Sequence, residues 1–160
     1  MNWATYWLRT ENEVNAIRVI TATALFVLSA VPAIAANVDV QMLNKGEAGN
    51  MVMEPAIVRI LPGDTVTFLP TDKGHNAESI KEMTPEGGDL FKGSIGKEVV
   101  ASFTVPGVYG IKCAPHFGMG MIALVVVGDD VSNLEAAKAA QMPKKAQERF
   151  APLFAEIETQ

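Results

Sequence analysis

The chain has 160 residues, which is enough for one globular domain with a single hydrophobic core and leaves no room for a second catalytic domain. Hydrophobic residues make up 49% and charged residues 19%, a balance that excludes an intrinsically disordered chain. The formal net charge of −5 disfavours nucleic acid as a partner, because binding to a phosphate backbone normally requires a basic surface.

The N-terminal segment predicts export. Arg18 precedes an apolar run over residues 19–35 that ends in Ala-Ile-Ala, the pattern of a signal peptide cleaved before Ala36. The run is shorter than the roughly 20 apolar residues that span a bilayer, so we expect cleavage and no membrane anchor in the mature protein. The predicted organisation is a cleaved signal peptide at 1–35, a β-sandwich at 36–128 and a helical extension at 129–160, in a periplasmic protein.

The segment from residue 38 to residue 127 predicts an all-β sandwich. Short runs of apolar and β-branched residues alternate with Gly, Pro, Asn and Asp, and no helix-length periodic segment interrupts them. Turn chemistry is present at residues 61–64 and 105–107, which both contain Pro followed by Gly. The candidate strands are residues 38–43, 57–61, 65–69, 99–104, 108–113 and 121–127.

The C-terminal segment predicts two helices. Ser132 with Glu135 three residues later favours a capped helix start, followed by Ala-rich sequence up to Gln141. Pro143 fits the first turn of a second helix. Apolar residues recur in that helix at helical spacing and predict a face packed on the sandwich, at Ala146, Phe150, Leu153, Phe154 and Ile157.

Soft metal donors lie between the last two predicted strands. Cys113, the only cysteine, is followed three residues later by His116 and five residues after that by Met121. Thiolate, imidazole and thioether groups suit copper, and a tight loop between two strands brings them around one point. A fourth donor has to come from elsewhere, and His75 is the only other histidine. A lone thiol in an exported protein is also explained by metal ligation.

This donor set predicts a redox site. Two His, one Cys and a weak axial Met form a blue-copper set, whereas structural zinc uses tetrahedral Cys and His. Four protein ligands leave no open position for a substrate, so we predict a Cu(I)/Cu(II) electron carrier and no enzyme. Three alternatives stay open at this point. Met119 competes with Met121, Cys113 with His116 resembles a catalytic thiol and its base, and a copper chaperone would exchange its metal.

Three motifs carry a family resemblance. They are Gly74-His75-Asn76 upstream of the cysteine, the segment from Lys112 through Met121 to Leu124, and Gln147-Glu148-Arg149 in the helical tail. On these motifs, residues 36–160 resemble the cupredoxins, and among them the pseudoazurins. The resemblance implies an eight-stranded Greek-key cupredoxin sandwich with two C-terminal α-helices. It also implies one copper ion with the ligands His75, Cys113, His116 and Met121.

The resemblance assigns supporting roles next to these ligands. The backbone amide of Asn76 is expected to donate to the Cys113 sulfur. Asn44 is expected to brace the loop before His75. Pro115 has no N–H and cannot donate to the sulfur, which limits the hydrogen bonding that tunes the site.

The resemblance also implies a transient partner. We expect a monomer that delivers electrons to a periplasmic reductase of denitrification, typically copper nitrite reductase, or to a c-type cytochrome. His116 would be the exit point, within an apolar patch that includes Met119. Surrounding lysines would steer an acidic partner. These lysines are Lys45, Lys73, Lys92 and Lys112, with the part played by Lys144 and Lys145 left open.

Overall fold

The computed structural model describes residues 35–159. The strands are β1 (Asn37–Gly46), β2 (Gly49–Glu54), β3 (Ile57–Ile60), β4 (Thr65–Leu69), β5 (Glu78–Ser79), β6 (Val99–Ser102), β7 (Gly107–Lys112) and β8 (Ile122–Val127). The helices are the 3-10 helices η2 (Lys81–Met83) and η3 (Ala114–Met119) and the α-helices α1 (Leu134–Ala139) and α2 (Lys144–Glu158). The predicted signal peptide, residues 1–35, lies outside the described residues apart from Ala35.

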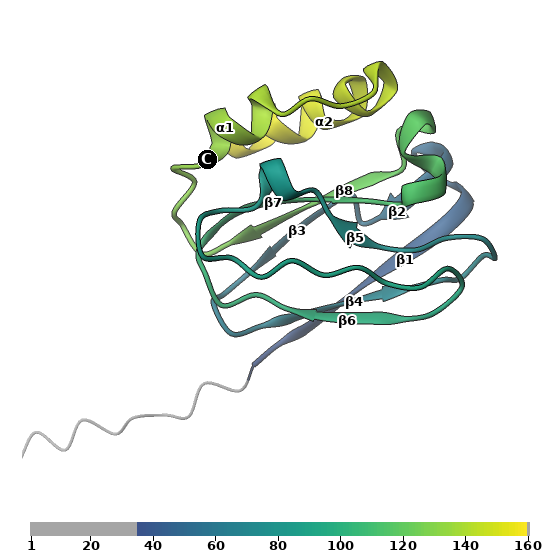
Figure 1. The fold of residues 1–160 in the computed structure, drawn as a ribbon, viewed down its shortest axis with the longest axis horizontal. Coiled ribbons are helices and arrows are strands. Elements are labelled where there is room, and N and C mark those ends of the chain that lie inside the picture. The colour runs from purple at the N-terminus through teal and green to yellow at the C-terminus, as the bar shows by residue number, and fades with distance from the viewer. Residues whose placement is uncertain (1–34, 160) are drawn as a thin grey trace, which may run out of the picture. The chain divides into compact units, whose positions relative to one another are not determined.

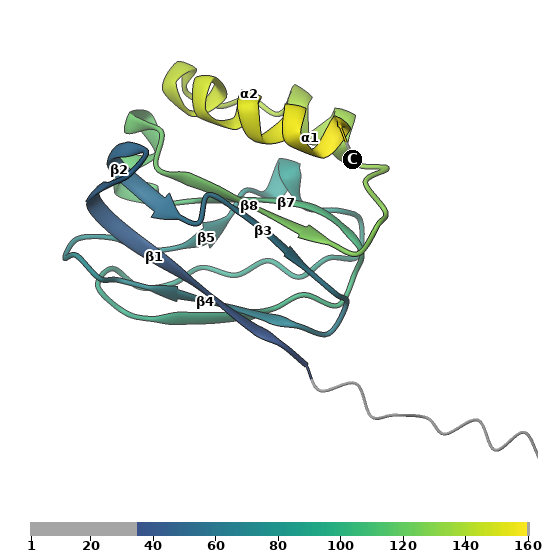
Figure 2. The ribbon, with the colours of Figure 1, turned by 180° about the vertical axis from the view of Figure 1, so that it is seen from behind.

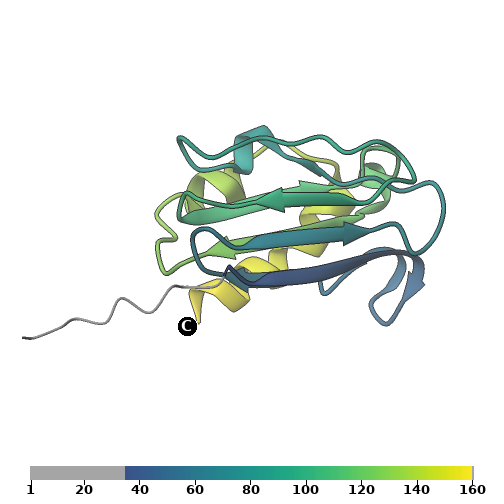
Figure 3. The same cartoon turned by 90° about the horizontal axis from the view of Figure 1, so that it is seen from below.

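Two four-stranded sheets pack face to face (Figure 1), with strand orders β2-β1-β4-β6 and β3-β8-β7-β5. β1 pairs in parallel with β4, and β3 pairs in parallel with β8, so the topology is not a simple meander. Figure 3 shows the first sheet from the side away from the helices. Side chains that point inward from both sheets form one buried cluster, which includes Val40, Phe68, Tyr109, Ile111 and Val125. The predicted all-β sandwich is confirmed.

The six strands predicted from the residues are all present, and two further strands were missed. β2 follows a tight turn and contains Met51 with a φ of 52°, a left-handed conformation that interrupts the regular strand pattern. β5 is only two residues long, so no periodicity marks it. Together they complete the eight strands that the family resemblance implies.

Both α-helices cover the outer face of the second sheet (Figure 2). The predicted apolar face of α2 is largely buried, with Phe150 and Ala146 fully inaccessible. These side chains form a second cluster with residues of β7 and β8, among them Val108 and Leu124. The helical tail therefore extends the hydrophobic core beyond the sandwich.

The predicted cap of α1 at Ser132 is wrong. The residue that precedes the helix is Asn133, and no side chain caps the first turn. The Asn133 amide is used elsewhere, because its Oδ1 accepts from the Val108 N–H at 2.9 Å and its Nδ2 donates to the Val108 carbonyl at 2.8 Å. Asn133 thus joins the helical tail to the backbone of β7.

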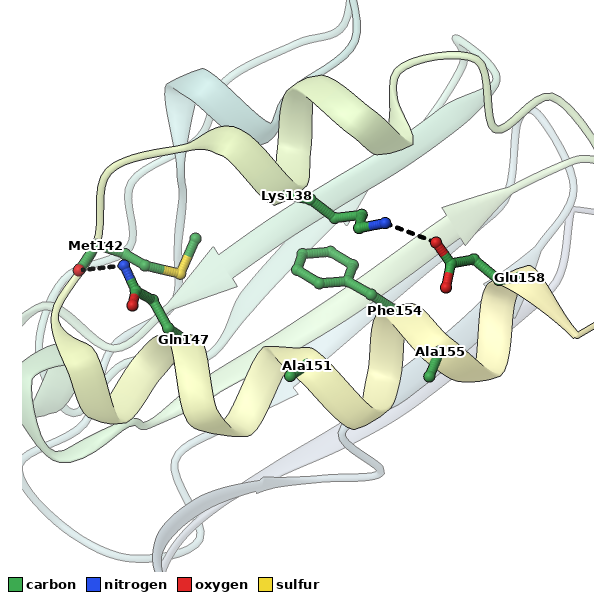
Figure 4. Close-up of a pocket in the computed structure, with 7 residues that line it drawn as sticks. All are labelled: Lys138, Met142, Gln147, Ala151, Phe154, Ala155 and Glu158. Carbon is green, nitrogen blue, oxygen red and sulfur yellow. Dashed lines mark hydrogen bonds and ion pairs between the residues drawn. The ribbon is translucent and has the colours of Figure 1, made fainter.

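A shallow groove runs between α1 and α2 (Figure 4). Lys138 donates across it to Glu158 Oε1 at 2.6 Å, and Gln147 Nε2 donates to the Met142 carbonyl at 3.3 Å. The first bond joins α1 to α2, and the second ties α2 to the linker that precedes it, so the groove is explained as a packing feature. Among residues 35–159, no helix is long and apolar enough to span a membrane.

Candidate metal centre

The loop from Cys113 to Met121 is fixed by its own backbone hydrogen bonds. The Cys113 N–H donates to the Met121 carbonyl at 3.0 Å, and the Met121 N–H donates to the His116 carbonyl at 3.2 Å. Pro115 occupies the first turn of η3, where its missing N–H costs nothing. Gly120 ends η3 with a φ of 82°, a conformation that glycine adopts without strain. The loop thereby returns the chain to β8 beside its starting point.

Three donor atoms converge at one end of the sandwich. His75 Nδ1 and His116 Nδ1 lie 3.1 Å apart, and Cys113 Sγ lies 3.8 Å from the first and 3.4 Å from the second. All three atoms lie within 4.8 Å of one another. Donors in a trigonal plane with bonds of about 2.0–2.3 Å to one ion lie roughly 3.5–4 Å apart. The spacing therefore fits a single metal ion.

Met121 lies beside this cluster. It is fully buried, and it belongs to the same packed core cluster as Cys113. Met119, its competitor, is 46% exposed on η3. The burial of the two methionines therefore favours Met121 as the thioether donor.

One hydrogen bond determines which ring nitrogen of His75 is unprotonated and available to bind a metal. Its Nε2 lies 3.0 Å from Asn44 Oδ1, and an amide oxygen only accepts, so Nε2 carries the proton. Burial, and then the neighbouring His116, lower the pKa of His75, with Asp72 partly opposing them. A neutral ring protonated at Nε2 presents a lone pair on Nδ1, toward the other donors.

Cys113 is buried among apolar side chains. Burial raises the pKa of its thiol, whereas hydrogen bonds from the backbone amides of Asn76 and His116 lower it and nearby Glu78 raises it further. The Asn76 side chain holds the loop as well, since its Oδ1 accepts from the Ala114 N–H at 2.8 Å. When a soft cation replaces the thiol proton, the two amide donors are placed to stabilise the bound thiolate.

Glu78 is a charged residue near the site that the sequence did not single out. Its side chain is almost buried, and its Oε1 lies 3.3 Å from Lys112 Nζ. Asn76 Nδ2 donates to Glu78 Oε2 at 3.4 Å. Glu78 thus links a surface lysine to the asparagine that supports the cysteine. Its position three residues after His75 was the only signal in the sequence.

Comparison with known proteins decides the family. A model described as copper-binding proteins of the plastocyanin/azurin family matches residues 40–128. The chain is 56% identical to the pseudoazurin of Methylorubrum extorquens over 135 residues, 84% of this chain and 91% of that protein. It is 56% identical to the pseudoazurin of Paracoccus pantotrophus over 136 residues, 85% of this chain and 93% of that protein. The chain belongs to the pseudoazurins.

A solved structure agrees with this assignment. The crystal structure of pseudoazurin from Methylobacterium extorquens AM1 has a TM-score of 0.74 and 59% identity to this chain, over 76% of this chain and 98% of that one. As a pseudoazurin, the protein is a copper-binding electron carrier and not an enzyme. The predictions of a copper cofactor and of a non-catalytic role are confirmed, and the catalytic-thiol alternative is set aside.

The lysines predicted for docking differ in whether they form ion pairs. Lys45 and Lys73 are exposed, and neither has an ion-pair partner within the described part of the chain. Lys112 is paired with Glu78 and lies 5.2 Å from the Phe117 ring centroid, and the exposed Lys92 lies 3.9 Å from Glu78. Lys45 and Lys73 are therefore the lysines with the most freedom to meet a partner.

Proposed function

We propose that His75, Cys113, His116 and Met121 hold the copper ion, and that the protein passes one electron to a periplasmic redox protein through His116. The convergence of two imidazole nitrogens and one thiol sulfur within 4.8 Å carries this proposal. Copper bound there supplies one-electron exchange between Cu(I) and Cu(II). The partial exposure of His116 supports its role as the exit point.

The surrounding residues would keep the donors in place in both oxidation states. Asn44 holds the His75 ring through Nε2, and Asn76 ties the start of the loop through Ala114. Pro115 offers no N–H, so the sulfur receives only the two backbone donors already described. A donor set that does not rearrange favours rapid electron exchange, since little reorganisation accompanies the change of charge.

We infer that the partner presents an acidic surface, and copper nitrite reductase is the first candidate, ahead of a c-type cytochrome. Lys45 and Lys73 lie on segments adjacent in sequence to Asn44 and His75, so their charges lie near the site. Met119 and Pro115 are exposed on η3 and supply an apolar centre. A basic ring steers the encounter, while a small apolar contact permits rapid release.

Replacing either free lysine is expected to slow electron transfer to copper nitrite reductase. In stopped-flow mixing at low ionic strength, Lys45→Gln and Lys73→Gln should each lower the second-order rate about threefold to fivefold, because each removes one attractive charge. The difference should vanish in about 1 M salt, where charges are screened beyond about 3 Å.

Lys81→Gln is the matched control, because Lys81 is an exposed lysine on η2. The short teal helix η2 lies between β7 and α1, away from the metal-binding loop (Figure 1). It should leave the rate unchanged. Equal slowing by all three variants would point to net charge alone and argue against a docking surface around His116. Fast, salt-independent electron transfer to a c-type cytochrome, with no transfer to copper nitrite reductase, would show that the proposed partner is wrong.

We further propose export, with residues 1–35 removed, and a mature monomer made of the sandwich at 36–128 and the helical extension at 129–160. The apolar run at 19–35 and the Ala-Ile-Ala sequence support this reading. Intact-mass measurement of protein from the periplasmic fraction should give a chain that begins at Ala36. A full-length chain in the membrane fraction would contradict it.

A further inference from the structure

One arginine of α2 reaches the metal-binding loop from outside the sandwich. Arg149 Nη1 donates to the Gly120 carbonyl at 3.0 Å and to the Met51 carbonyl at 2.6 Å, and Nη2 donates to the Asn50 carbonyl at 2.7 Å. We propose that Arg149 is a positioning residue that fixes where Met121 enters the metal site. This inference rests on the ligand role proposed above for Met121.

The bond to Gly120 acts on the peptide group that leads into Met121. The Gly120 carbonyl and the Met121 N–H belong to one planar unit, so fixing the oxygen fixes the direction of the amide. That amide donates to the His116 carbonyl, and the Met121 carbonyl accepts from Cys113. Arg149 therefore holds the carbonyl of a peptide group whose N–H is bonded to His116, another proposed ligand, and the next peptide group along the chain is bonded to Cys113.

The loop also lies in direct contact with α2 at Gly120. A Cβ atom at this position would lie 2.8 Å from the Lys145 carbonyl oxygen and 2.9 Å from Arg149 Cδ. Contacts below 3.0 Å require something to shift, and here one of them is rigid helix backbone. The close packing of Gly120 on the Lys145 backbone is an observation separate from the hydrogen bonds, and it shows that the loop packs directly against α2.

The other two bonds of Arg149 hold a second segment, the start of β2. Met51 has a φ of 52°, which is uncommon for a residue with a side chain and needs support from its surroundings. Its side chain is partly buried against the core cluster that contains Cys113 and Met121. Arg149 thus joins β2 and the metal-binding loop, which are far apart in sequence, through one rigid guanidinium group.

The chemistry of the side chain suits this role. A guanidinium group is planar, permanently charged and carries several donors in fixed directions, so it serves three carbonyls at once. A lysine keeps the charge but provides a single donor point. Because the strength of the axial thioether bond tunes a site of this kind, a shift of the Gly120–Met121 peptide is expected to change both its spectrum and its reduction potential.

The test compares Arg149→Gln and Arg149→Lys with Arg59→Gln. Arg59 is the matched control, because it also joins the sandwich to α2, through Glu156 at 3.6 Å, but from β3. Three quantities are measured: the intensity ratio of the visible bands of the Cu(II) form, the reduction potential, and amide hydrogen exchange at Met121 in the copper-free protein.

We expect Arg149→Gln to change the band ratio and the potential, and to speed exchange at Met121 about tenfold or more, as the loss of a charge-assisted hydrogen bond implies. Arg149→Lys should fall between this variant and wild type, and Arg59→Gln should match wild type. If Arg149→Gln only lowers the unfolding temperature, or if Arg59→Gln has the same effects, Arg149 is an ordinary structural residue and the inference is overturned.

The copper-free measurement separates this inference from the proposed function. If wild-type protein fails to form a thiolate–copper site, the ligand assignment fails whatever the variants do. Exchange at Met121 still reports whether Arg149 holds the loop, with unchanged exchange in the variants counting against it. Arg149→Lys keeps the charge and is the variant to use should Arg149→Gln not fold.

Discussion

Cys113→Ser is expected to abolish the intense visible absorption of the Cu(II) protein and its reversible redox cycle. The band requires charge transfer from a thiolate, and Cys113 is the only cysteine in the chain. A serine hydroxyl is a hard donor that does not suit Cu(I), so the reduced form should lose its metal as well. The measurement is an optical titration with Cu(II) followed by voltammetry.

Met119→Leu is the control for this variant, because Met119 is exposed on the same loop and its removal leaves all four proposed ligands in place. Its spectrum and potential should stay close to wild type. A serine variant that kept the blue colour would show that the sulfur of Cys113 is not the ligand. A large spectral change in Met119→Leu would reopen the choice between the two methionines.

Phe150→Ala is expected to lower the free energy of unfolding by about 3–5 kcal/mol, the usual effect of truncating a buried aromatic side chain. Phe150 is fully buried between α2 and the second sheet and stacks on Phe154 with ring centroids 5.6 Å apart. This loss is a large part of the roughly 5–15 kcal/mol by which a domain is stable. Because each kcal/mol shifts the unfolding temperature of a domain of this size by several degrees, that temperature should fall by about 10–20 °C.

The same variant tests whether the helical extension and the sandwich unfold together. Near-ultraviolet circular dichroism of Tyr109 follows the unfolding of the sandwich core, and far-ultraviolet circular dichroism follows the helices. Both signals should shift by the same amount. Leu153→Ala removes a half-buried side chain of the same helix and should cost less than half as much. An unchanged sandwich transition in Phe150→Ala would mean that the helices fold as a separate unit.

The sequence predicted the parts of this protein that depend on local pattern. Short apolar and β-branched runs between turn residues located strands such as β4 and β8, and helical spacing located the buried face of α2 around Phe150. The cluster Cys113, His116 and Met121 was visible because all three lie in one loop. His75 was found by elimination, since the chain has only one other histidine.

The remaining features depend on contacts between distant segments, which spacing does not reveal. Asn44 reaches the His75 ring from β1, and its expected place near this loop came from family resemblance alone. Arg149 lies 29 residues from Gly120 and 98 from Met51, so nothing local marks its contacts. Asn133 was missed for the same reason, because its amide bonds to β7 and leaves the first turn of α1 uncapped.

The central claim is that Cys113 and the two histidines form one redox-active copper site. It is tested most directly by the optical spectrum of the mature protein after one equivalent of Cu(II), then after ascorbate, then after reoxidation. We expect an intense visible thiolate-to-copper band that bleaches on reduction and returns in full. A protein that stayed colourless, or one that lost its colour once while Cys113 became oxidised, would contradict the account.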